Sequence, residues 1–163
     1  MANERVWKEG VVAGVLGAGA VALWFLILDI IAGAPLATPA LLGRTLFSVL
    51  GKGIDWTPSA YVAAYTIFHV AAFVVVGIIV RAVVEASESI PGVLAGLLLF
   101  FVIFEVGSYY ITAFLSQPES MGRLSWWRVG VANLIAAIVM GWYLWHGHPE
   151  LKSRFSRALV GQS

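Results

Sequence analysis

Long apolar runs separated by short polar segments follow one another along almost the whole chain. Four of these runs are long enough, at about 1.5 Å of rise per helical residue, to cross a hydrocarbon core about 30 Å thick. They extend over Gly10–Gly33, Pro58–Val84, Pro91–Leu115 and Trp127–Trp145. The pattern therefore predicts an all-α integral membrane protein, in which residues 1–163 form a single domain built as a four-helix transmembrane bundle.

The segment between the first two runs is longer than a simple turn requires. Leucines and other apolar residues recur there at helical spacing from Thr38 to Leu50, and Gly51 follows. Such a stretch, interrupted by the basic side chain of Arg44, is typical of a helix that lies in a membrane interface. We predict a short interfacial helix over 38–50.

The two ends of the chain each allow two interpretations. The tail, 149–163, places Leu151, Phe155 and Leu159 on one helical face among basic residues, which fits an anionic membrane surface as well as a frayed terminus. Basic residues precede the first apolar run, as they do in a secretory signal. The run is much longer than the roughly 7–15 apolar residues of a signal and contains Asp29, so we expect a retained helix.

Composition supports lipid as the solvent, because 60% of the residues are hydrophobic and only 12% are charged, against about 25% charged in soluble domains. The net charge of +1 gives no basic surface for nucleic acid.

With four spans the two termini share one side of the membrane. That side holds Arg5, Lys8, Arg81, Lys152, Arg154 and Arg157, and the other holds Arg44, Lys52, Arg123 and Arg128. The bias predicts cytoplasmic termini.

Small residues form a ridge along the first predicted helix. Gly10, Gly14, Ala18 and Ala22 recur every four residues. Such ridges let helices approach closely in lipid, where the hydrophobic effect does not drive one helix onto another. Packing within the bundle and contact with another subunit are both consistent with this ridge.

Polar groups inside the spans are the candidate functional residues, because an ionisable side chain in hydrocarbon costs at least about 2.5–3.5 kcal/mol and normally faces protein or water. The predicted cluster consists of Asp29, Tyr65, His69, Glu105, Tyr109 and Asn133. Counting residues from the helix ends places them in the outer half or the centre of the membrane. Glu105 paired with His69 would serve proton movement, and the same cluster as a satisfied hydrogen-bond network would fix helix register.

Cofactor sites are not predicted. The chain has no cysteine, and His69 is the only histidine inside a predicted span, whereas a bis-histidine haem needs ligands on facing helices. His146 and His148 are two residues apart and do not converge on a metal. Asp29, His69 and Glu105 differ in predicted depth by about 10 Å or more, which is too far for one ion.

The opening Val6–Gly10, the run Ala22–Asp29 and the later Trp127–Asn133 resemble small four-span membrane proteins of bacteria that have no known activity. The resemblance implies a multi-pass protein of the bacterial inner membrane and supplies no site residues. With so little mass outside the membrane, we expect a structural or accessory subunit, either homo-oligomeric or bound to other membrane subunits. A proton, ion or small-solute pathway through Glu105 and His69 is the alternative, and a membrane-embedded enzyme or cofactor-binding protein comes third.

Overall fold

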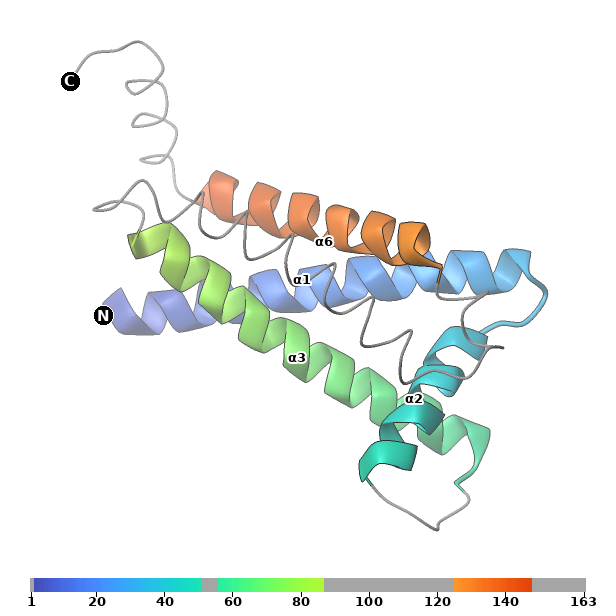
Figure 1. Cartoon of the computed structure of the whole chain (residues 1–163). Coiled ribbons are helices and arrows are strands. Elements are labelled where there is room, and N and C mark those ends of the chain that lie inside the picture. The colour runs from blue at the N-terminus through green and yellow to red at the C-terminus, as the bar shows by residue number, and fades with distance from the viewer. Residues whose placement is uncertain (1, 51–55, 87–124, 148–163) are drawn as a thin grey trace.

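The computed structural model describes residues 2–50, 56–86 and 125–147, which contain helices and turns but no strand. Its helices are α1 (Ala2–Ile31), α2 (Ala37–Leu50), α3 (Pro58–Ala86) and α6 (Trp126–Gly147), as Figure 1 shows. Helices therefore occur at three of the four predicted spans and at the segment 38–50. The predicted span Pro91–Leu115 and the tail 149–163 lie outside the described residues.

Helix α1 begins well before the predicted start at Gly10. Its first turn carries Glu4, and Arg5 pairs with Glu9 one turn later at 2.8 Å. An acidic side chain at a helix N-terminus and an i, i+4 ion pair both favour helix ahead of the apolar run. The polar segment that precedes the first apolar run is thus helical.

The end of α1 is a Schellman turn. The Ala34 N–H donates to the Asp29 carbonyl at 2.9 Å, and the Gly33 N–H donates to the Ile30 carbonyl at 3.0 Å. Gly33 has a φ of 69°, which glycine adopts without a Cβ clash. The turn satisfies the last carbonyls of α1 and redirects the chain toward α2.

Helices α3 and α6 both begin at a hydroxyl residue. The Thr57 carbonyl accepts from the Ala60 and Tyr61 N–H groups, and Pro58 occupies the first helical position. The Ser125 carbonyl accepts from Arg128 and Val129 in the same way. Proline suits this position because its missing N–H would have no partner within the helix.

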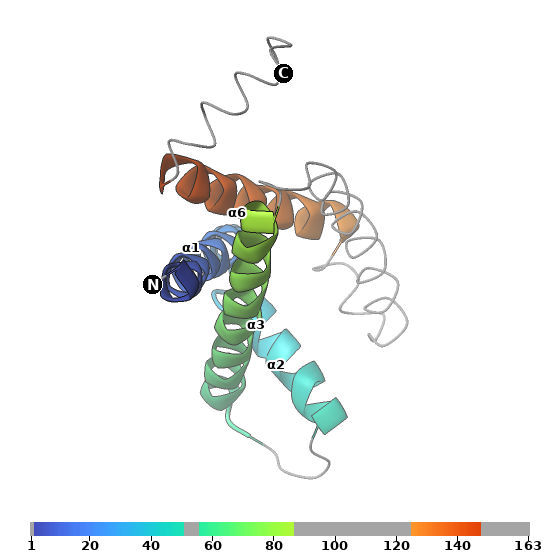
Figure 2. The same ribbon diagram turned by 90° about the vertical axis from the view of Figure 1, so that its left-hand side faces the viewer.

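Helix α1 lies between α3 and α6 and runs opposite to both. The start of α6 lies beside the later part of α1, where the Trp24 indole donates to the Arg128 carbonyl at 3.1 Å. Leu144, near the end of α6, packs in a cluster with Ala13 of α1 and Val84 of α3. We call the end of the bundle where α1 begins and α3 and α6 end the N-terminal end, and the opposite end the α2 end (Figures 1 and 2).

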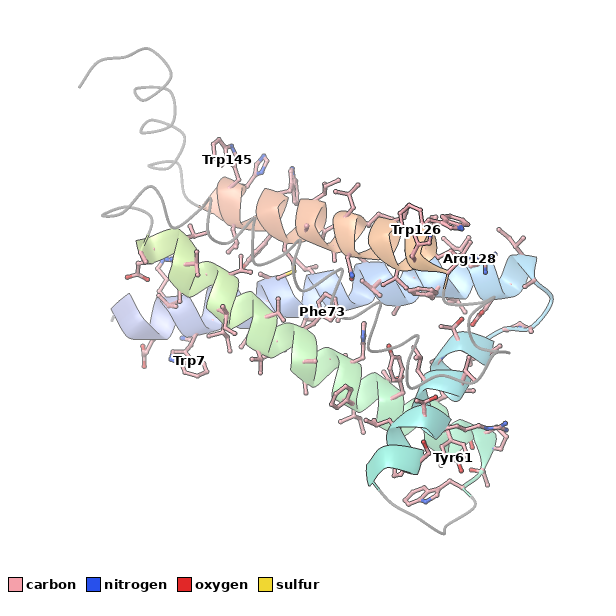
Figure 3. The ribbon with its side chains drawn as sticks, in the orientation of Figure 1. Trp7, Tyr61, Phe73, Trp126, Arg128 and Trp145 are labelled. Atoms are coloured by element: carbon pink, nitrogen blue, oxygen red, sulfur yellow. The ribbon has the colours of Figure 1, made fainter. Side chains whose placement is uncertain are left out.

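Two small apolar clusters make up the described core. One is built on Ala13, Met140 and Leu144, and the other on Val21, Ala132 and Ala136. Phe73 of α3 packs against both clusters, and Figure 3 shows it near the middle of the bundle. Small residues on α1 and α6 thus let these helices pack closely around one aromatic ring.

Most of the apolar surface of the three long helices faces outward. Each of α1, α3 and α6 is long and apolar enough to cross a membrane, yet only 11% of the most apolar part of α3 is buried inside the bundle. Ile67, for example, is 71% exposed. Three such faces on so small a bundle are typical of helices that contact lipid.

Tryptophans mark the two ends of this apolar zone. Exposed indoles lie at Trp7, Trp142 and Trp145 toward the N-terminal end, and at Trp56, Trp126 and Trp127 toward the α2 end. Figure 3 shows Trp7 and Trp145 at one end and Trp126 at the other. Amphipathic indoles favour the headgroup level on both sides of a bilayer, and the two groups fit that pattern.

Candidate functional site

Helix α1 crosses α3 with backbone against backbone at three glycines. A Cβ added at Gly14 would lie 2.6 Å from the Val74 Cα, and one added at Gly77 would lie 2.6 Å from the Gly14 nitrogen. A Cβ at Gly10 would meet the Ile78 Cα at the same distance. Because the atoms met are backbone, no side chain can move aside. We call Gly10, Gly14 and Gly77 the glycine crossing.

Only the first part of the predicted small-residue ridge lies on the contact face of α1. Gly10 and Gly14 face α3, and Ala18 is 2% exposed, whereas Ala22 is exposed and Val21 is buried in its place. A step of four residues advances about 400° around a helix of 3.6 residues per turn, so each step turns the ridge by about 40°. By Ala22 the ridge has turned away from the contact face.

A group of charged side chains closes the N-terminal end next to the glycine crossing. The Arg81 Nε donates to a Glu9 carboxylate oxygen at 2.7 Å, and Arg5 donates to the other oxygen at 2.8 Å. Arg81 also reaches Glu85 at 3.4 Å. The Arg81 side chain is 8% exposed and that of Glu9 is 17% exposed. We call Arg5, Glu9, Arg81 and Glu85 the ion cluster.

Arg81 was counted only among the cations on the side of the two termini, and the structure places it buried within α3. A signal for the pairing was nonetheless present. Arg81 and Glu85 are four residues apart on one helix face, and Glu9 lies at the same end of an antiparallel neighbour. Since the long helices overrun the apolar zone, an arginine near the end of α3 can be buried against the polar start of α1.

Asp29 joins α1 to α2. One carboxylate oxygen accepts from the Thr38 N–H and the other from the Thr38 hydroxyl, both at 2.7 Å. Gly33 and Leu36, both with positive φ, turn the chain back so that α2 begins beneath this carboxylate. The acceptor satisfies one of the unpaired N–H groups in the first turn of α2. Counting residues from the helix ends had not predicted this contact of Asp29 with Thr38.

Asp29→Ala is expected to lower the free energy of unfolding by about 1–2 kcal/mol, the usual effect of removing a side chain that caps a helix. Asp29→Asn keeps an acceptor for the Thr38 N–H and should lose less. Unfolding of the full chain in mixed detergent micelles, followed by circular dichroism, measures both variants. Equal loss in the two would mean that charge, rather than the hydrogen bonds to Thr38, holds α2 in place.

The structure brings together two of the predicted polar residues in the middle of α3. Tyr65 and His69 stack with ring centroids 5.6 Å apart, and His69 continues onto Phe73 at 4.8 Å. The His69 Nε2 lies 3.3 Å from the Ala18 carbonyl of α1, a geometry in which the imidazole N–H donates. His69 therefore connects α3 to α1 just beyond the glycine crossing.

The other predicted residues are placed apart from this pair or not described. Asn133 is half-buried on α6, directly after the buried Ala132. Glu105 and Tyr109 lie outside the described residues. The proposed pairing of Glu105 with His69 therefore stays a prediction.

Histidine and carboxylate groups are dispersed where the structure describes them. No group of three or more metal-ligating side chains occurs within 2–50, 56–86 and 125–147. The His146 Nδ1 lies 3.0 Å from the Trp142 carbonyl, and its ring packs on the Trp142 indole at 4.6 Å. His146 is thus engaged by the preceding turn of its own helix.

A cavity of about 250 Å³ lies at the N-terminal end between α1 and α6. Its lining consists of Glu9, Trp142, Tyr143, Leu144, His146 and Gly147. The Glu9 carboxylate has both oxygens engaged by arginines, so the acidic group of this lining is already neutralised. The arrangement fits imperfect packing of apolar rings better than a site for a charged ligand.

No family model, no curated protein and no solved structure matches the chain.

Proposed function

We propose that the chain is a four-span integral membrane protein that acts as a structural or accessory subunit of a membrane assembly. The observation that carries this proposal is how the polar groups of the described helices are used. Asp29 holds α2, His69 meets the Ala18 carbonyl, and Arg81 pairs with Glu9. Each connects one helix to another, as expected of a scaffold whose polar groups fix packing.

The directions of the described helices support a fourth span. Helix α3 ends at the N-terminal end of the bundle, and α6 begins at the α2 end, beside Trp24. Two membrane helices that run in the same direction require the chain between them to return across the bilayer. The predicted span Pro91–Leu115 would provide that return, and both termini would then lie on the same side.

The basic residues support cytoplasmic termini in a bacterial inner membrane. Arg5, Lys8 and Arg81 lie toward the N-terminal end, while Arg44 and Arg128 lie toward the α2 end. The basic tail predicted at 149–163 adds to the first group. Positive charge concentrates on the cytoplasmic side of membrane proteins.

A proton or ion pathway is the second candidate, and the Tyr65–His69 stack favours it. A histidine at the centre of a span is costly in lipid unless it serves packing or function. In this alternative, Glu105 would face His69 and the pair would exchange a proton. The contact between His69 and Ala18 supports packing, which is why the subunit proposal comes first.

Purification of the tagged full chain in mild detergent, with its mass and composition measured, separates the two proposals. A subunit is expected to copurify with other membrane polypeptides at a fixed ratio, and His69→Ala should reduce that copurification because it removes a contact between α3 and α1. A symmetric oligomer of this chain alone, with proton flux in vesicles that His69→Ala abolishes, would favour the pathway. A lone monomer without flux would contradict both.

A further inference from the structure

A cluster of aromatic rings and one arginine joins α2 to the beginning of α3 at the α2 end. Phe47 of α2 stacks on Trp56 at 4.9 Å and meets Tyr61 of α3 edge-on at 5.9 Å. The backbone N–H of Trp56 donates to the Tyr61 hydroxyl at 3.3 Å. The guanidinium of Arg44 lies 5.7 Å from the centre of the Tyr61 ring. We call these four residues the aromatic corner; Figure 3 labels Tyr61 within it.

The corner is rigid because α2 and α3 meet there through backbone. A Cβ added at Gly43 would lie 2.7 Å from the Tyr61 carbonyl carbon, so α2 seats directly on the first turns of α3. Arg44 follows Gly43 and is thereby fixed beside Tyr61. An arginine held over an aromatic ring loses less conformational entropy on binding a ligand than a free one.

Arg44 retains most of its binding capacity. Its side chain is exposed, and among the described residues it forms no ion pair with a carboxylate. This contrasts with Arg5 and Arg81, which both pair with Glu9. A guanidinium carries five N–H donors in a fork that fits a phosphate group.

We propose that the aromatic corner binds the phosphate of a phospholipid headgroup. The inference rests on the proposed function only in requiring that these helices lie in a bilayer. Trp56 is 42% exposed, and indoles favour the glycerol level just below the phosphates. Trp126 and Trp127 lie toward the same end, so the corner belongs to one interface. A soluble phosphate would gain only the arginine, whereas a lipid also contacts Trp56 and Phe47.

The test uses the full chain in mild detergent, titrated with a short-chain phosphatidylglycerol brominated near its glycerol. The Trp56 signal is the difference in fluorescence quenching between the wild type and Trp56→Phe. We expect saturable quenching, with Arg44→Gln raising the half-saturation concentration about tenfold, because a charge-assisted pair with phosphate is lost. Arg44→Lys should fall between. The matched control is Lys8→Gln, which removes one exposed charge at the N-terminal end and should leave quenching unchanged.

Three results would overturn the inference. Arg44→Gln with wild-type circular dichroism and wild-type half-saturation would show that the arginine does not hold the phosphate. Equal effects of Arg44→Gln and Lys8→Gln would show a general charge effect. Displacement of the lipid by an equal concentration of inorganic phosphate would indicate a soluble anion site. Each of these three results is compatible with a chain that inserts in a membrane. A chain that stays dispersed in buffer without detergent would overturn the proposed function as well.

Discussion

Gly14→Ala is expected to destabilise the bundle by about 2–3 kcal/mol, at the upper part of the range for overpacking a close-packed site. The added methyl carbon would lie 2.6 Å from the Val74 Cα and would also contact the Phe73 carbonyl. Since these are backbone atoms of α3, relief requires the two helices to separate. Separation weakens the contacts of Gly10 and Gly77 as well and carries His69 away from the Ala18 carbonyl.

The matched control is Gly19→Ala on the same helix. No described atom lies within 4 Å of a Cβ added at Gly19, so the substitution should be neutral or stabilise by up to about 1 kcal/mol through helix propensity. Unfolding of both variants in mixed micelles of a mild detergent and dodecyl sulfate, followed by circular dichroism, gives the comparison. Equal effects at the two positions would mean that the glycine crossing does not determine how α1 and α3 associate.

Helices and their approximate ends were predictable because each depends on local sequence. An apolar run of spanning length, Thr57 before Pro58 and the glycine at position 33 all act within a few residues of their own position. The described helices α3 and α6 accordingly begin within one residue of the predicted starts. The start of α1 was missed because apolar length was counted, whereas the pairing of Arg5 with Glu9 extends the helix beyond the apolar run.

Partners across helices were less predictable, because depth does not give direction around a helix. Counting along each run placed Asp29 near the membrane boundary but did not show that Thr38 would turn back to meet it. The ridge rule selected Gly10 and Gly14, but it did not identify Gly77 as the facing glycine. Such contacts depend on the angle at which two helices cross, which no single helix encodes.

The ion cluster was missed for a different reason. Charged residues near helix ends are markers of membrane topology, and Arg81 was counted among the cytoplasmic cations. The structure gives it a second role as the buried partner of Glu9. A positive charge can set the orientation of the chain during insertion and then form an ion pair within the folded bundle, so the two roles are compatible.

Arg81→Met is expected to lower the free energy of unfolding by about 2–3 kcal/mol, somewhat below the usual cost of leaving one member of a fully buried pair alone. The Arg81 side chain is 8% exposed, and its loss leaves Glu9, 17% exposed, with Arg5 as its basic partner in the cluster. The comparison variant is Arg5→Gln. Arg5 is 63% exposed, so solvent already screens its pairing and its loss should cost less than about 1 kcal/mol.

A double-mutant cycle between Glu9→Gln and Arg81→Met tests whether the two side chains act as a pair. If the ion pair joins α1 to α3, the double variant should be less damaged than the sum of the single variants, with a coupling free energy of about 1–2 kcal/mol. The ion pair would then help to fix how far α1 slides along α3. Additive losses would place the effect of Arg81 in its pairing with Glu85 on α3 itself, because that contact does not depend on Glu9.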